Sequence, residues 1–134
     1  MQLNQITLSV SDIARSIVFY AGFGLELIVR AEPRYARFLC PGGSTLSLHT
    51  APPPIATGGV LVYFECEDLD GRVAALARAG YVFEAPPRDQ PWLWREAYLR
   101  DPDGHPLCLF HAGENRITPP WRLPVRGGRA KGEA

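Results

Sequence analysis

The sequence lacks an excess of either charge. Its 134 residues carry 14 basic and 14 acidic side chains, so the formal net charge is zero. Proteins that bind nucleic acid normally carry a basic excess on one face, and this balance therefore argues against such a partner. The one locally basic stretch begins at Arg126 and is short and glycine-rich, so we expect it to be a solvated, disordered end.

The sequence also lacks long hydrophobic runs and paired cysteines. No apolar stretch approaches the roughly 20 residues that span a bilayer, and the N-terminal residues Met-Gln-Leu-Asn-Gln do not resemble a signal peptide. Its three cysteines, Cys40, Cys66 and Cys108, are an odd number without close metal-type spacing. Each lies in an apolar run, where a free cysteine behaves as a small hydrophobic residue. We therefore expect a cytoplasmic protein that does not associate with membranes.

One pattern occurs twice in the chain. The segment that begins at Gln5 returns 56 residues later at Leu61, and the same offset carries Ile17 onto Val73 and Gly24 onto Gly80. Each copy reads as an apolar strand, an acidic turn, a helix, a glycine and further apolar segments. With 46% hydrophobic and 21% charged residues, the composition is that of a globular domain. The repeat predicts two equivalent modules within one domain.

Module one is predicted to cover residues 2–50. The pattern indicates a strand over 3–10 and then a helix, with Asp12 or Ser11 as its cap and with Ile13, Ile17 and Tyr20 on one face. Three further strands are predicted, and a linker rich in proline and glycine follows over 51–59. These three strands cover residues 25–30, 35–39 and 45–50.

Module two is predicted to cover residues 60–112. It begins with a strand and a helix over 69–79, and extended segments follow at 81–84, 94–100 and 106–111. The turn Asp101-Pro-Asp-Gly104 precedes the last strand. Aligning Gly43 with Gly104 gives an offset of 61 that places Ser47 on Cys108. We expect a single domain over 1–113 and a proline-containing extension over 114–134, which Trp121 could pin to the domain.

Three motifs in this order resemble the vicinal-oxygen-chelate superfamily, which includes glyoxalases, bleomycin-resistance proteins and extradiol dioxygenases. They are the strand from Leu3 to Asp12, the segment Ser16-Ile-Val-Phe-Tyr20 leading to Gly24-Leu-Glu-Leu27, and the turn Asp101-Pro-Asp-Gly104. With the repeat, the resemblance covers residues 2–112. It implies an α+β fold in which two tandem βαβββ modules form a curved mixed-sheet cup, commonly within a homodimer.

The resemblance also implies where a metal ion would bind. Metal-dependent members place one ligand on the first strand and one on the last strand of each module, and these positions are here Gln5, Ser47, Leu61 and Cys108. Divalent ions prefer imidazoles and carboxylates at such positions. Glutamine is acceptable, but serine is a poor ligand, leucine cannot bind, and a single thiolate does not make a site. We therefore expect neither a metal ion nor another cofactor.

The cup that remains is predicted to bind a small molecule. Strand alternation aims Tyr63, His49 and Phe110 inward, which gives an aromatic and aliphatic lining without an assured carboxylate. Two tryptophans, two residues apart on an extended chain, could stack on a planar or cationic ligand, although tryptophans more commonly fill the core or an interface. The predicted ligand-binding residues are Gln5, Arg37, Ser47, His49, Leu61, Tyr63, Trp92, Trp94, Cys108 and Phe110, and no catalytic residue is predicted.

Three functions remain open at this point. The first is a metal-free, dimeric small-molecule binding protein that sequesters an antibiotic or toxic compound. The second is a metal-dependent lyase, isomerase or dioxygenase that uses an atypical ligand set of Gln5, His49 and Cys108, with Glu65 as a further candidate. In the first reading, Glu65 is solvated near its strand end. The third is a scaffold or regulatory protein with an empty cup.

Overall fold

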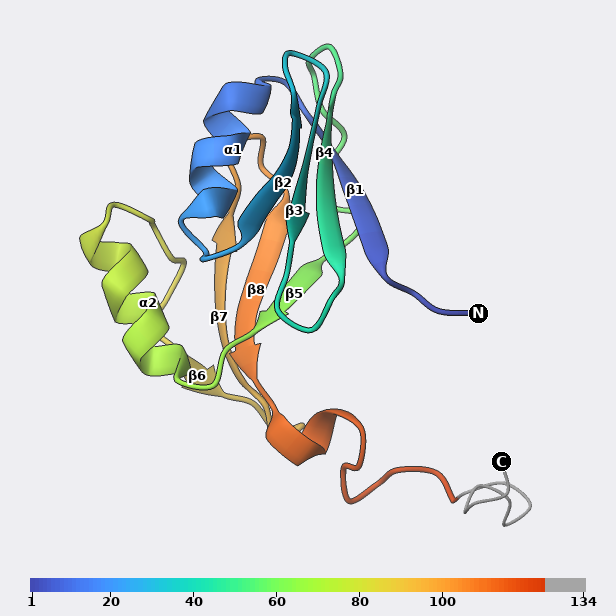
Figure 1. The fold of residues 1–134 in the computed structure, drawn as a ribbon. Helices are drawn as coiled ribbons and strands as arrows, with labels where there is room; N and C mark the ends of the chain where they lie inside the picture. The colour runs from blue at the N-terminus through green and yellow to red at the C-terminus, as the bar shows by residue number, and fades with distance from the viewer. Residues whose placement is uncertain (125–134) are drawn as a thin grey trace.

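The computed structural model describes residues 1–124, so the predicted disordered end lies outside the described residues. Module one contains β1 (Gln5–Val10), α1 (Ile13–Ala21), β2 (Glu26–Ala31), β3 (Tyr35–Leu39) and β4 (Thr45–Thr50). Module two contains β5 (Val62–Glu65), α2 (Leu69–Arg78), β6 (Arg88–Asp89), β7 (Arg95–Arg100) and β8 (Pro106–His111). A short 3-10 helix, η1 (Gly113–Arg116), follows (Figure 1).

Each module forms its own four-stranded mixed sheet. The strand orders are β1-β4-β3-β2 and β5-β8-β7-β6, in which the first strand of each module is parallel to the last. The α+β prediction of two tandem βαβββ modules is therefore confirmed, and within the chain the two sheets do not close onto each other. Neither helix among residues 1–124 is long and apolar enough to cross a membrane.

The repeated sequence positions perform the same task in both helices. Asp12 accepts a hydrogen bond from the Arg15 backbone N–H at 3.1 Å, and Asp68 accepts one from the Gly71 backbone N–H at 3.0 Å. Both aspartates therefore cap the first turn of a helix. Beyond the helix ends, Gly24 and Gly80 take φ values of 84° and 103°, which residues with a side chain rarely adopt.

One hydrophobic core spans both modules. Every second residue of the long strands points toward the helices and is buried, while the intervening residues form the opposite surface of each sheet. We call these opposite surfaces the open faces. The module-one open face comprises Thr7, Tyr35, Arg37, Ser47 and His49, and the module-two open face comprises Tyr63, Trp94, Glu96, Tyr98, Cys108 and Phe110.

Hydrogen bonds attach the turn between β7 and β8 to module one. The buried Tyr20 hydroxyl of α1 donates to Asp101 at 2.7 Å, and Ser11 donates to Asp103 at 2.5 Å. The His105 ring nitrogen Nε2 lies 2.7 Å from the Ser9 carbonyl oxygen. These contacts fix how the two sheets are placed relative to each other.

The structure differs in two respects from the expectations about module two and the extension. Residues 81–84 do not form a strand of the sheet, because only Phe83 makes an isolated bridge to Leu99 and the edge strand is instead the two-residue β6. The prolines at 86, 87 and 91 lack the N–H that a longer edge strand would need. Trp121 is 57% exposed, so the expected pinning of the extension is not observed.

Candidate functional site

The module-one open face is hydrophilic. The hydroxyl oxygens of Thr7 and Ser47 lie 2.5 Å apart on neighbouring strands. Arg37 donates from Nε to the Tyr35 hydroxyl at 2.9 Å, and its guanidinium lies 5.4 Å from the centre of that ring. A hydrogen bond from Ser47, with a further one from Arg37, lowers the pKa of Tyr35. His49 is exposed at the end of β4, in register with Tyr35.

The module-two open face is aromatic. The rings of Trp94 and Phe110 are stacked, with centroids 4.7 Å apart at 26°. The Tyr63 ring stands nearly perpendicular to both, at 5.8 Å from Trp94 and 5.3 Å from Phe110. Tyr63 is 42% exposed, so part of this cluster is open to solvent. Such a surface suits a planar or cationic group.

Trp92 and Trp94 were expected on an extended chain, but the structure places them in a loop. They flank Leu93 in a tight hairpin loop between β6 and β7, closed by hydrogen bonds from Gln90 N to Trp94 O at 2.8 Å and from Leu93 N to Gln90 O at 3.0 Å. Leu93 has a φ of 68°, in the left-handed region. This bend places the Trp92 indole against the module-two open face.

Glu96 is a site residue that the sequence analysis missed. Its side chain lies on the module-two open face opposite Phe110 and is only 2% exposed. It accepts hydrogen bonds from the Trp92 indole N–H at 2.8 Å and from the Tyr98 hydroxyl at 2.5 Å. Counting back from the tight turn at 101–104 would have revealed its position, because such a turn sets the register of the flanking strands.

Glu65 is exposed near the end of β5, as expected, but its carboxylate is also held by hydrogen bonds. Its Oε2 accepts hydrogen bonds from the backbone N–H groups of Ala112 and Gly113 at 2.7 and 2.9 Å. Its Oε1 lies 3.6 Å from Nε of Arg116. Glu65 therefore holds the start of η1, which follows the repeat, and this partner could not be read from the repeat itself.

The four positions at which the resemblance implies metal ligands do not suit a metal ion. Gln5 uses its amide oxygen to accept a hydrogen bond from Thr45 at 2.8 Å, Ser47 is bound to Thr7, and Leu61 has no donor atom. Burial, with the nearby charge of Glu96, raises the pKa of the Cys108 thiol to about 12, whereas a metal ligand must be a thiolate.

The other acidic, cysteine and histidine residues do not form an alternative metal site. Within residues 1–124, no three histidine, cysteine, aspartate or glutamate side chains gather in a way that could hold a metal ion. His105 is bound to the Ser9 carbonyl, and the His111 ring nitrogen Nδ1 lies 2.9 Å from the Cys66 carbonyl oxygen. One ring nitrogen of each of these two histidines is therefore engaged by a backbone carbonyl oxygen.

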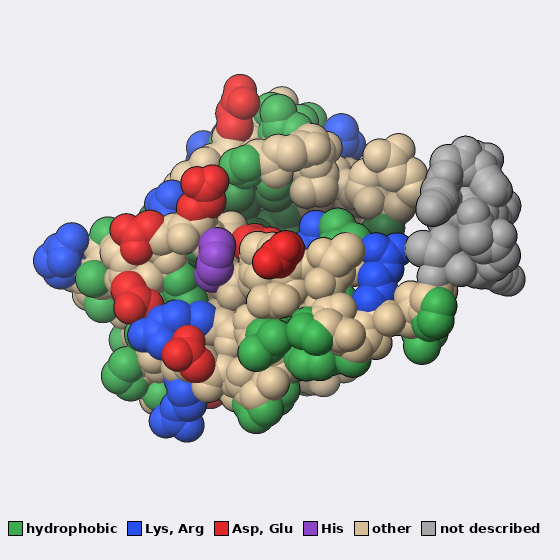
Figure 2. Space-filling model, turned by 90° about the horizontal axis from the view of Figure 1, so that it is seen from below, with side chains coloured by type: hydrophobic (Ala, Val, Ile, Leu, Met, Phe, Trp, Pro, Cys, Tyr) green, Lys and Arg blue, Asp and Glu red, His purple; other side chains and the backbone are tan. Residues whose placement is uncertain are grey.

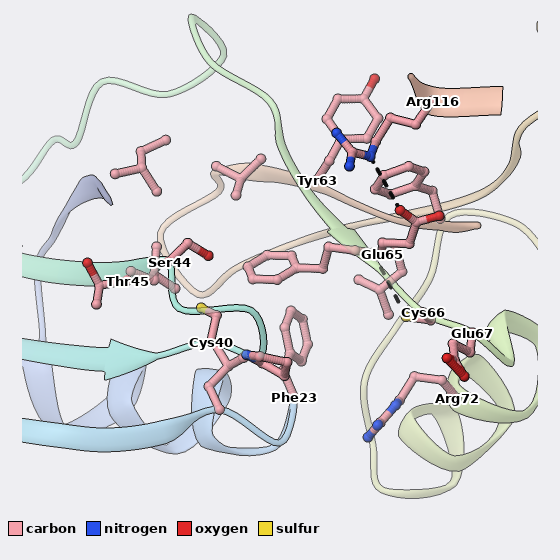
Figure 3. A pocket seen from close by; sticks show the side chains of 18 of the residues that line it. Phe23, Cys40, Ser44, Thr45, Tyr63, Glu65, Cys66, Glu67, Arg72 and Arg116 are labelled. Carbon is pink, nitrogen blue, oxygen red and sulfur yellow. Dashed lines mark hydrogen bonds and ion pairs between the residues drawn. The ribbon is translucent and has the colours of Figure 1, made fainter. Parts of the chain in front are cut away.

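A crevice of about 1160 Å³ opens between the two modules. Seen from below, the surface is hollowed there, with hydrophobic side chains inside the hollow and charged side chains around it (Figure 2). Phe23, Cys40 and Thr45 approach it from module one, and Tyr63 and Glu65 approach it from module two (Figure 3). The crevice is open to solvent and borders the aromatic cluster through Tyr63 and Phe110.

The ten predicted ligand-binding residues fall into three groups in space. Those that line the crevice are Gln5, Leu61, Tyr63 and Phe110. Those on the module-one open face are Arg37, Ser47 and His49, and the remaining three, Trp92, Trp94 and Cys108, lie on or against the module-two open face. Within one chain, these groups therefore do not form a single closed pocket.

Comparisons with known proteins agree with this architecture. No curated protein sequence matches the chain. A glyoxalase/bleomycin resistance protein/dioxygenase from Nocardioides is 25% identical, with a TM-score of 0.73 over 92% of this chain and 90% of the other. TioX from Micromonospora sp. ML1 is 22% identical, with a TM-score of 0.68 over 84% of this chain and 99% of the other.

A third structure, lactoylglutathione lyase from Agrobacterium tumefaciens, is 21% identical and has a TM-score of 0.69 over 82% of this chain and 92% of the other. The two structures below 25% identity establish a shared fold only. The model of the Glyoxalase/Bleomycin resistance protein/Dioxygenase superfamily matches residues 2–109, which cover module one and module two as far as the middle of β8. The chain therefore belongs to the glyoxalase/bleomycin resistance protein/dioxygenase superfamily.

Proposed function

We propose that this protein binds a small planar molecule without a metal ion, using the aromatic cluster of the module-two open face. The observation that carries the proposal is the arrangement of Tyr63, Trp94 and Phe110. Two of these rings stack, while Tyr63 stands across them and is 42% exposed beside the open crevice. Aromatic clusters that remain open to solvent are suited to stacking on a flat ligand.

The proposed oligomeric state is a homodimer, in which a second copy of the chain covers exposed apolar side chains of module two and of the linker before it. Isolated exposed apolar residues are ordinary, but neighbouring ones can mark binding surfaces. Val60 and Leu61, which are adjacent in sequence, are 56% and 36% exposed, and Trp92 and Leu93, also adjacent, are 43% and 47% exposed. Sedimentation velocity of the full chain measures the oligomeric state, and a monomer at all accessible concentrations would contradict this part of the proposal.

The proposed biological role is to sequester a toxic or antibiotic compound in the cytoplasm. The three cysteines are all free thiols, which suits a reducing compartment. TioX and the lactoylglutathione lyase have related folds but different names, so a ligand cannot be transferred from either of them to this chain.

Ligand titration of the Tyr63→Ala variant tests the proposal. The probe is phenazine, an uncharged planar molecule, and binding is followed by tryptophan fluorescence and by the shift in Tm. Loss of one aromatic contact should weaken binding by about tenfold. Trp121→Ala is the matched control, because it removes an exposed aromatic residue from the extension, and its affinity should equal that of the unmodified protein.

Two results would contradict the proposal. If Tyr63→Ala binds phenazine as tightly as Trp121→Ala does, the ligand does not contact the aromatic cluster. If elemental analysis finds about one tightly held metal ion per chain after incubation with zinc, nickel, manganese and iron(II), the protein is not metal-free.

A further inference from the structure

Glu96 is a buried carboxylate that has no cationic partner among residues 1–124. It is 2% exposed, and both of its recorded donors, the Trp92 indole and the Tyr98 hydroxyl, are uncharged. Burying a carboxylate is costly unless a cation or several hydrogen bonds compensate for the lost water. Two neutral donors leave part of the hydrogen-bonding capacity of the carboxylate unused, because a carboxylate offers about four lone-pair sites.

Several other acidic side chains of module two are paired with a cation. Asp70 and Asp89 both bind Arg95, at 2.8 and 3.0 Å, and Glu65 lies 3.6 Å from Arg116. Those carboxylates are considerably more exposed than Glu96. Glu96 is therefore more deeply buried than these paired carboxylates and yet has no recorded ion pair of its own among residues 1–124.

The surroundings of Glu96 are aromatic, and its polar neighbours are protonated. Phe110 lies directly opposite on β8. Burial, reinforced by the hydrogen bond to Glu96, raises the pKa of Tyr98. Burial, and then the charges of Cys108 and Glu96, raise the pKa of Tyr63. At neutral pH these hydroxyls carry no charge, and Glu96 supplies the carboxylate among the residues of the module-two open face. Aromatic ring faces add to its attraction for a cation.

Trp92 contacts this carboxylate from an exposed position. Its indole N–H donates to Glu96 at 2.8 Å, while Trp92 itself is 43% exposed. The next residue, Leu93, holds a φ of 68° that is strained for a residue with a bulky side chain. The loop therefore places a half-exposed tryptophan next to a strained backbone residue, and a change in the loop conformation would relieve that strain.

Building on the proposed function, we infer that the module-two open face selects ligands that carry a positive charge on or beside a flat apolar group. The flat group stacks on the cluster of Tyr63, Trp94 and Phe110. The Trp92 indole moves aside, and the cation takes its place against the Glu96 carboxylate. Trp92 thus serves as a positioning residue that stabilises the carboxylate until the ligand arrives.

A matched pair of probes tests the charge preference. N-methylacridinium is a flat cation, and acridine has nearly the same shape but is uncharged in mildly alkaline buffer. Fluorescence titration of the full chain should give the cation an affinity about tenfold higher. Glu96→Gln keeps the size of the side chain and should abolish the preference. Glu114→Gln removes an exposed carboxylate from η1 and should retain it.

Trp92→Phe separates the inferred role from a structural one. This variant removes the indole N–H but keeps an aromatic ring, so Glu96 loses a competing donor. We expect N-methylacridinium to bind severalfold more tightly, while binding of acridine changes little. If Trp92 only stabilises the fold, Tm falls and the affinity for the cation does not rise, which would overturn the inference. Circular dichroism confirms that each variant is folded.

The outcomes also distinguish this inference from the proposed function. Equal binding of both probes to the unmodified protein would overturn the charge preference and leave planar binding intact. A preference that persists in Glu96→Gln would overturn the assignment to Glu96. Failure of both acridine probes and of phenazine to bind would overturn the inference and the proposed function together.

Discussion

The two modules share their core but differ on their open faces. Strands β3 and β4 align with β7 and β8 at an offset of 61 residues, and the strand registers agree with this alignment. The equivalent core pairs are Ala36 and Ala97, Phe38 and Leu99, Leu46 and Leu107, and Leu48 and Leu109. Small residues align with small ones and large apolar residues with large apolar ones, as expected if this surface has to pack against a helix.

On the open faces, by contrast, every equivalent pair differs in chemistry. These pairs are Tyr35 and Glu96, Arg37 and Tyr98, Ser47 and Cys108, and His49 and Phe110. A guanidinium lies beside a tyrosine in module one, and a carboxylate lies beside a tyrosine in module two. The fold constrains one surface of each sheet and leaves the other free, so functional information resides in the differences between the copies.

The largest effect is expected from breaking the shared core in either module. Leu46→Ala and Leu107→Ala each remove a side chain that is no more than 2% exposed, and each should lower the free energy of unfolding by about 2–5 kcal/mol. All three tryptophans lie beyond module one, so their fluorescence reports on module two and the extension. In urea, Leu46→Ala should shift the fluorescence and circular dichroism transitions together.

A separation of the two transitions would contradict this expectation. If Leu46→Ala shifts the circular dichroism transition but leaves the tryptophan transition in place, the modules unfold separately. The continuous core and the buried bond between Tyr20 and Asp101 would then contribute less to cooperativity than their positions indicate.

A smaller effect should appear at alkaline pH, where the paired positions Ser47 and Cys108 differ. Burial raises the pKa of Cys108 from 9.0 to about 12. The unfolded chain can ionise this thiol from about pH 9, whereas the folded chain resists ionisation until about pH 12. The free energy of unfolding is therefore unaffected by this thiol below pH 9 and falls as the pH rises from 9 toward 12. By pH 10.5, Cys108→Ser, which installs the module-one residue, should have lost about 1–2 kcal/mol less than the unmodified protein.

Urea denaturation of both proteins at pH 8 and at pH 10.5 would measure this difference. Titration of the tyrosines affects both proteins and largely cancels in the comparison. Equal losses in the two proteins would mean that the Cys108 thiol ionises as readily in the folded chain as in the unfolded one.

The smallest effect concerns the hairpin loops. Among residues 1–124, Leu93 is the one non-glycine residue recorded with a positive φ. Glycine adopts this conformation without a steric penalty, so Leu93→Gly should stabilise the fold of the single chain by about 0.5–1 kcal/mol despite the loss of a half-exposed side chain, apart from the contact that Leu93 makes with the proposed second copy. Leu93→Ala retains the Cβ atom and should not stabilise it. Thermal unfolding compares the two, and a higher Tm for alanine than for glycine would contradict the presence of strain.

Much of the fold could be predicted because the repeat constrains it. Asp12 was one of two predicted helix caps, and the repeat related Gly24 to Gly80; in the structure Asp12 caps α1, the equivalent Asp68 caps α2, and both glycines have a positive φ. The open-face position of Phe110 followed from strand alternation. These features depend on local patterns that recur at a fixed distance.

The features that the sequence analysis missed depend on local exceptions or on contacts outside the repeat. A left-handed leucine is rare, so the bend that brings Trp92 to Glu96 could not be expected from composition. Glu65 is bound by the backbone N–H groups of Ala112 and Gly113, at the end of module two and the start of η1. The position of Glu96 could have been predicted from the register of β7 and β8. Strand alternation, however, was applied only to the first and last strands of each module, and Arg37, Trp92 and Trp94 were added for their side-chain chemistry.

The linker between the modules has a consequence for engineering this protein. Residues 51–61 contain no helix or strand and are mostly exposed, whereas Tyr20, Ser11 and Ser9 attach module one directly to residues 101–105, between β7 and β8. Side-chain contacts, rather than the peptide connection, therefore set the spatial relation of the halves. A gene divided within this linker would encode two fragments that can recognise each other, and a binding event could then be reported by their reassembly.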